Sequence, residues 1–151
     1  MRKILIFFTI LFLNINPAYS LIEVDITRGN LDPLPIAVSP LHVDPKSENF
    51  KDMKIKELGD SVSAVIEKNF KSTGLFNPLN KDAFVQKPDI AHLKPRFEDW
   101  RLITAQALVT GKLLIKDGKL KVEFRLWDLA ASKEMIALAF TTTPSNWRRV
   151  A

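Results

Sequence analysis

Histidine and cysteine set the first limit on the chemistry that this chain can perform. It contains no cysteine, so it offers no disulfide, no thiolate nucleophile and no cysteine-ligated zinc or iron–sulfur cluster. Its two histidines, His42 and His92, lie far apart in the sequence, and neither is accompanied by a second histidine or an acidic cluster at metal-ligand spacing. We interpret both as structural histidines and predict no metal and no other cofactor.

Carboxylates and hydroxyls offer no stronger candidate for catalysis. The pairs Glu98–Asp99 and Lys133–Glu134 lie on segments whose pattern predicts exposed helix and turn faces, where acids are normally solvated. No serine stands in a G-x-S-x-G frame, and the five glycines form no phosphate-binding loop. We therefore predict that the protein is not an enzyme.

The basic residues indicate no nucleic-acid partner. The chain carries 22 Lys and Arg against 17 Asp and Glu, a formal net charge of +5, but basic and acidic residues alternate along most of it. Nucleic-acid binders instead gather Lys and Arg on one face, with aromatic side chains for stacking. Trp147 beside Arg148 and Arg149 resembles such a patch locally, yet a helix with one buried tryptophan and two exposed arginines is the simpler interpretation.

The first twenty residues have the pattern of an export signal. Arg2 and Lys3 precede an apolar run from Ile4 to Leu13, and Ala18-Tyr19-Ser20 supplies small residues at a cleavage site. The run is about ten residues long, whereas a membrane-spanning helix needs about twenty. We predict a signal peptide over residues 1–20 that is cleaved after Ser20, a periplasmic mature chain and no direct membrane span.

Hydrophobic periodicity predicts the elements of the mature chain. Alternation over residues 21–29 predicts a strand, and spacing of three or four over residues 53–70 predicts a helix that Gly74 ends. Further strands are expected at 36–38, 107–115, 120–127 and 135–142, the last three as a meander turning at 116–119 and 130–132. A short helix is expected at 98–106 and another from Ser145, with loops at 41–52 and 81–94. The fold class is therefore α/β (α+β), a mixed sheet of about five strands with two main helices packed on it.

The apolar faces of these elements predict the core. Trp127 falls by parity on the solvent side of its strand, and either a helix covers it or a partner does. The predicted core residues are Ile36, Val38, Ile55, Leu58, Val62, Ile66, Phe70, Phe76, Trp100, Ile103, Leu113, Leu120, Val122, Phe124, Leu126 and Phe140.

Several segments together resemble one bacterial family. They are Pro35–Val38 with Pro40, Ser72–Leu79, Trp100–Gly111, Val122–Asp128 and Asn146–Arg149. In this order and spacing they are similar to the N-terminal domain of the TolB family, which belongs to the periplasmic Tol-Pal system. The resemblance covers essentially the whole chain after the signal peptide, and it implies two helices on a mixed sheet.

The resemblance also implies a role in binding without chemistry. Family members link inner-membrane Tol proteins to the lipoprotein Pal and support outer-membrane invagination at cell division and outer-membrane integrity. They continue into a six-bladed β-propeller that contacts Pal. The present sequence stops before such a propeller, so we expect contact with Pal only if one were present. We expect three parts: residues 1–20 as signal peptide, 21–30 as a partner-binding strand and 31–151 as the α/β domain.

The partner-binding residues are assigned by the same resemblance. In the family, the stretch just after the signal peptide engages the C-terminal domain of TolA, and here that place is taken by Ile22, Glu23, Val24, Asp25, Ile26, Thr27 and Arg28. In the free protein this strand could instead pair with its own sheet. The alternatives for the whole chain are a small periplasmic ligand-binding or hydrolase domain, or an inactive fragment of a split family member.

Overall fold

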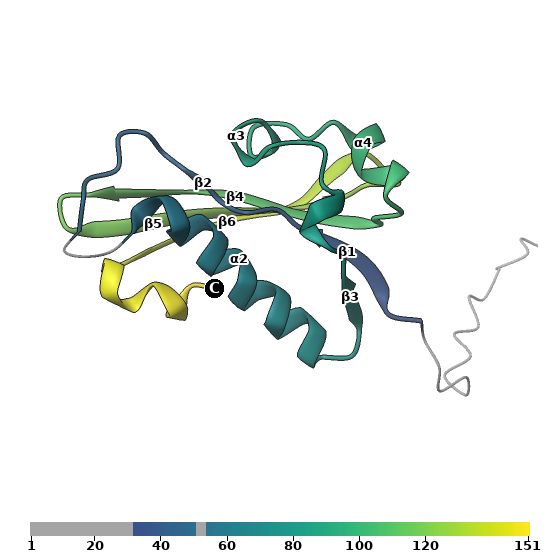
Figure 1. Cartoon of the computed structure of the whole chain (residues 1–151), viewed down its shortest axis with the longest axis horizontal. Coiled ribbons are helices and arrows are strands. Elements are labelled where there is room, and N and C mark those ends of the chain that lie inside the picture. The colour runs from purple at the N-terminus through teal and green to yellow at the C-terminus, as the bar shows by residue number, and fades with distance from the viewer. Residues whose placement is uncertain (1–31, 51–53) are drawn as a thin grey trace, which may run out of the picture. The chain divides into compact units, whose positions relative to one another are not determined.

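The protein is described here by a computed structural model that covers residues 32–50 and 54–151. These residues form one mixed sheet with helical segments on both faces (Figure 1). The expected fold class is confirmed. Among these residues, no helix combines the length and the apolar character that crossing a membrane requires.

The sheet combines parallel and antiparallel pairing. Five strands lie in the order β3-β1-β4-β5-β6. The remaining strand, β2, also pairs with β4. The parallel part joins β1 to β3 and β4, whereas β4, β5 and β6 form the expected antiparallel meander. The strands are β1 (Leu34–Val38), β2 (His42–Val43), β3 (Phe76–Pro78), β4 (Ala107–Lys116), β5 (Lys119–Asp128) and β6 (Lys133–Thr142).

Strands β1 and β2 behave as one strand broken at Pro40. β1 pairs with Ala107–Val109, and β2 pairs farther along the same strand, at Lys112 and Leu113. A proline cannot donate a backbone hydrogen bond, so the ladder is interrupted between the two. The prediction of a loop over residues 41–52 is therefore wrong at His42–Val43, where two residues are too few to give a period-two signal.

Helix α2 (Ile55–Ser72) packs on one face of the sheet. Its apolar stripe turns Leu58 and Val62 toward the sheet, as the helical spacing predicts. Gly74 has a φ of 71°, the left-handed conformation that commonly ends a helix and that glycine adopts without strain. The buried cluster on this face contains Leu41, Ile55, Leu58, Val62, Leu113, Ile115, Leu120 and Val122.

The opposite face is covered by α3 (Pro88–Ala91) and α4 (Phe97–Leu102) (Figure 1). Trp100 is buried there, and Trp127 is only 7% exposed, with its indole edge against Phe97. Trp127 lies on the face of β5 that was predicted to be exposed to solvent. A helix, and not a partner protein, covers it there. Trp127 Nε1 donates to Thr110 Oγ1 at 2.8 Å, which satisfies the buried indole.

Two helical predictions differ from the structure in detail. The helix expected at 98–106 begins at Phe97 and ends at Leu102, because Thr104 adopts a positive φ of 63° and Gln106 N donates to Pro35 O in the sheet. The C-terminal segment from Pro144 to Arg149 is a 3₁₀ helix. Residues 81–94 contain a 3₁₀ turn over Lys81–Ala83 and the single helical turn of α3, where only a turn and a loop are predicted.

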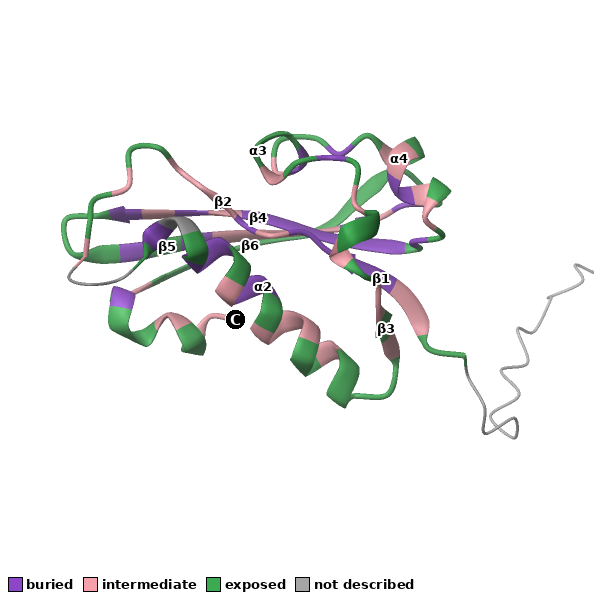
Figure 2. Ribbon diagram, viewed as in Figure 1, coloured by how far each residue is buried: buried purple, intermediate pink, exposed green. Residues whose placement is uncertain are grey.

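Strand β6 departs most from the predicted core. Phe140 is 41% exposed and does not belong to the core, so its assignment there is wrong. Figure 2 shows exposed residues along most of β6, whereas β1 and β4 are mainly buried. The physical reason is position, because β6 is an edge strand and a hollow lies between it and the side chains of Ile66 and Phe70 in α2. Six other residues predicted for the core are only half-buried. They are Ile66, Phe70, Phe76, Ile103, Phe124 and Leu126.

Candidate functional site

The sequence-predicted partner-binding residues lie outside the described part of the chain. Ile22, Glu23, Val24, Asp25, Ile26, Thr27 and Arg28 all precede residue 32, so their assignment stays a prediction. The structure describes the scaffold that follows them, which begins with β1 in the interior of the sheet.

An apolar groove lies beside the edge strand β6 on the α2 face. One hollow of about 250 Å³ is bordered by Ile66 of α2, Phe124 of β5 and Leu138 of β6. A second hollow of about 500 Å³ shares Phe70 and Leu126 with the first. The linings carry one charged residue each, Arg125 and Asp128, so the groove suits apolar side chains and not acid–base chemistry.

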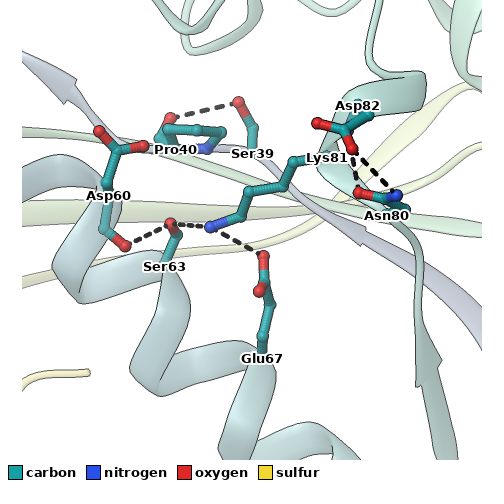
Figure 3. A network of polar contacts seen from close by, with 8 residues as sticks. All are labelled: Ser39, Pro40, Asp60, Ser63, Glu67, Asn80, Lys81 and Asp82. Atoms are coloured by element: carbon teal, nitrogen blue, oxygen red, sulfur yellow. Dashed lines mark hydrogen bonds and ion pairs between the residues drawn. The ribbon is translucent and has the colours of Figure 1, made fainter.

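A partly buried polar network fixes the start of the segment that leads toward α3. Lys81 Nζ donates to Ser63 Oγ at 3.0 Å and lies 3.1 Å from Glu67 Oε1, while Ser63 Oγ donates to Asp60 O at 2.9 Å (Figure 3). Ser63 is fully buried in α2, so these bonds satisfy a hydroxyl that has no access to water. The network thereby ties the turn after β3 to α2, and we interpret it as structural.

The two histidines, which lie fifty positions apart in the sequence, meet in the fold. The rings of His42 in β2 and His92 at the end of α3 stack with centroids 4.3 Å apart and planes 5° from parallel. Burial and the neighbouring His92 hold the pKa of the His42 imidazole below its ordinary value of 6.5, although Asp89 and Asp44 act in the opposite direction. The sequence pattern gave no signal for this pairing, because it depends on β2 and α3, two elements that were not predicted.

The carboxylates considered for catalysis form ion pairs with arginine side chains. Glu98 pairs with Arg101 on the same helix, and Asp99 lies 2.6 Å from Arg96, the residue just before that helix. Glu134 lies on β6 and pairs with Arg125. Within residues 32–50 and 54–151, no group of three or more histidine and carboxylate side chains is placed to hold a metal ion. In the C-terminal segment, the Arg148 guanidinium stacks over the Trp147 ring, with 4.6 Å between Arg148 Cζ and the ring centroid.

Comparison with known proteins gives a family match. The family model described as the TolB amino-terminal domain matches residues 22–135. The Tol-Pal system protein TolB of Pelagibacter ubique is 68% identical over 135 residues, which cover 88% of this chain. The match covers 30% of that relative, so this chain spans less than a third of its length.

Solved structures with little sequence identity share the fold. TolB from Acinetobacter baumannii matches with a TM-score of 0.60 at 15% identity, over 78% of this chain and 25% of that chain. The C-terminal domain of LpoB from Salmonella enterica matches with a TM-score of 0.51 at 8% identity, over 77% of this chain and 87% of that one. At such identities the likeness concerns the fold alone.

Proposed function

Because this chain belongs to the family of TolB amino-terminal domains, we propose that it is a non-enzymatic protein–protein interaction domain of the Tol-Pal system. The observation that carries the proposal is the family match, which starts at residue 22 and therefore includes the segment assigned to partner binding. The apolar groove and the structural role of the polar network are consistent with binding rather than catalysis.

The partner is the C-terminal domain of TolA, and residues 22–28 bind it as an added strand. In this mode, main-chain hydrogen bonds to a sheet edge supply affinity, while alternate side chains fill pockets. Ile22, Val24 and Ile26 lie on one face of an extended segment, and Glu23 and Asp25 lie on the other. The two carboxylates favour a partner edge that carries positive charge.

The protein acts in the periplasm, after removal of residues 1–20. There its contact with TolA supports outer-membrane invagination during cell division and outer-membrane integrity. We assign no contact with Pal to these 151 residues, since in the family that contact belongs to the propeller.

A binding titration tests the assignment of residues 22–28. The purified C-terminal domain of TolA is titrated by calorimetry with the chain that starts at Leu21 and with a version that starts at Asn30. The longer chain is expected to bind and the shorter one to lose binding, with the same thermal unfolding curve for both. Equal affinity of the two versions would exclude residues 22–28 as the binding strand.

A pair of point variants tests the apolar face of the strand. Val24→Asp places a charge on the apolar face, and we expect it to weaken binding by at least about tenfold, the equivalent of 1.4 kcal/mol. Val85→Asp is the matched control, because it introduces the same charge at a position that is 66% exposed and lies outside residues 22–28. The proposal predicts that the control binds within about twofold of the parent chain, a difference of about 0.4 kcal/mol.

A further inference from the structure

The stacked histidines join the sheet to the segment that covers one of its faces. His42 belongs to the sheet, and His92 belongs to the segment that crosses the sheet's outer face. His92 Nδ1 lies 3.0 Å from Pro88 O, and a carbonyl only accepts, so Nδ1 carries a hydrogen and donates it.

The charges around the pair are nearly balanced while the rings are neutral. Cationic groups lie around the rings on β4, on β5 and just before α3, and carboxylates lie on α2, α3, β5 and just after β2. These groups are Asp44, Asp60, Lys87, Asp89, Lys112, Glu123 and Arg125. Surroundings of this charge tolerate one protonated ring. When both rings are protonated, however, the two imidazolium charges repel each other, because the ring centroids are only 4.3 Å apart.

We propose that the His42–His92 stack is an acid-sensitive latch, which holds α3 against β2 when at most one ring is protonated and releases it when both are. Buried Ala91, the last residue of α3, would be uncovered by the release. Because burial and His92 lower the pKa of His42, release is expected on the acid side of pH 6.5.

Two fixed attachments confine the release to a short segment. Gln86 Oε1 accepts from Arg96 N and from Trp100 Nε1, both at 2.9 Å, and so holds the two ends of residues 87–95 together. Arg125 Nη1 donates to His92 O at 3.2 Å and so attaches this segment to β5. The expected motion is thus a local loosening of α3, with the sheet and α2 unchanged.

Hydrogen–deuterium exchange of the whole chain at pH 7.5 and pH 5.5 tests the latch. After correction for the intrinsic effect of pH, peptides over residues 87–95 are expected to exchange about tenfold faster at pH 5.5, because two like charges in contact disfavour the stacked arrangement. Peptides over α2 are expected to keep their protection. Equal protection of residues 87–95 at both pH values would overturn the proposal, as would equal acceleration throughout the chain.

Two variants at His42 separate stacking from titration. His42→Phe keeps a flat ring that takes up no proton, so we expect protection at pH 5.5 to remain at the pH 7.5 level. His42→Gln removes the ring, and we expect faster exchange at both pH values with no pH dependence. An acid-induced increase that persists in His42→Phe would show that the stack is not the sensor.

Discussion

Gly59 sets how closely α2 approaches the sheet. A Cβ at this position would lie 2.0 Å from Leu41 O, a main-chain atom that cannot move without shifting the connection between β1 and β2. Glycine normally costs a helix about 1 kcal/mol relative to alanine, so the replacement would stabilise an unobstructed helix. At Gly59 we expect the opposite sign: Gly59→Ala should lower the free energy of unfolding in urea by about 1 to 3 kcal/mol.

Lys68→Ala is the control for that experiment, because Lys68 is exposed on the same helix. Its effect should stay within about 0.5 kcal/mol. A Gly59→Ala protein as stable as the parent would mean that α2 lies farther from Leu41 than described.

Gln86 supports Trp100 through its side-chain oxygen. It is 4% exposed, and its Oε1 is the acceptor for both the indole Nε1 of Trp100 and the backbone N of Arg96. Gln86→Met keeps the length of the side chain but leaves the buried indole N–H and the partly buried Arg96 N–H without an acceptor, so we expect a loss of about 1 to 3 kcal/mol in urea unfolding. Gln106→Met, at an exposed position, should change stability by less than about 0.5 kcal/mol. Similar losses in both variants would contradict the role of the buried acceptor.

Individual side-chain contacts were the part of the structure that the sequence predicted least well. Apolar periodicity gives the face on which a residue lies, but not what covers that face. Trp127 lies on the predicted face and is nevertheless buried, because α4 covers it. The stacking of His42 on His92 depends on the pairing of β2 with β4, a long-range contact with no local pattern.

Elements with long, regular patterns were predicted well. α2 follows its three-four apolar spacing, and Asp117 and Gly118 both adopt the positive φ values that the predicted hairpin turn requires. Short elements, β2 and α3, were missed because two to four residues carry too little periodicity. The candidate binding strand over residues 22–28 has the pattern of a strand, and its assignment remains a prediction.

The contrast between β5 and β6 gives a prediction for these two strands. Leu120 of β5 is fully buried under α2, whereas Leu138 of β6 is 52% exposed. The same substitution at both sites therefore compares burial directly: Leu120→Ala should cost about 2 to 5 kcal/mol and Leu138→Ala less than about 1 kcal/mol. Chemical denaturation at two protein concentrations measures both. A large cost at Leu138, particularly one that depends on concentration, would show that the face of β6 is covered in solution.

At the scale of the whole molecule, two groups make folding stability depend on pH. A hydrogen bond from Lys121 holds the pKa of the Glu123 carboxyl below its ordinary value of 4.5, against the opposing effect of burial. Glu123 therefore stabilises the fold above pH 4.5, and this contribution is lost as the pH falls through its folded-state pKa. For His42 the pKa is lowered by burial and by His92, so the unfolded chain binds the proton more readily. The resulting loss in the free energy of unfolding is absent well above pH 6.5 and grows as the pH falls below that value.

The free energy of unfolding should therefore decline in two steps on acidification, one below pH 6.5 and one below pH 4.5. His42→Phe should remove the upper step and leave the lower, because it deletes the imidazole while Glu123 and Lys121 stay paired. Glu123→Gln should flatten the lower step and leave the upper. Urea unfolding from pH 8 to pH 3.5 in each variant measures both steps, and 0.5 M salt should weaken the Glu123 step more, since its ion pairs are partly exposed to solvent. A single decline unaffected by either variant would instead indicate general charge repulsion in a chain whose net charge is already +5 at pH 7.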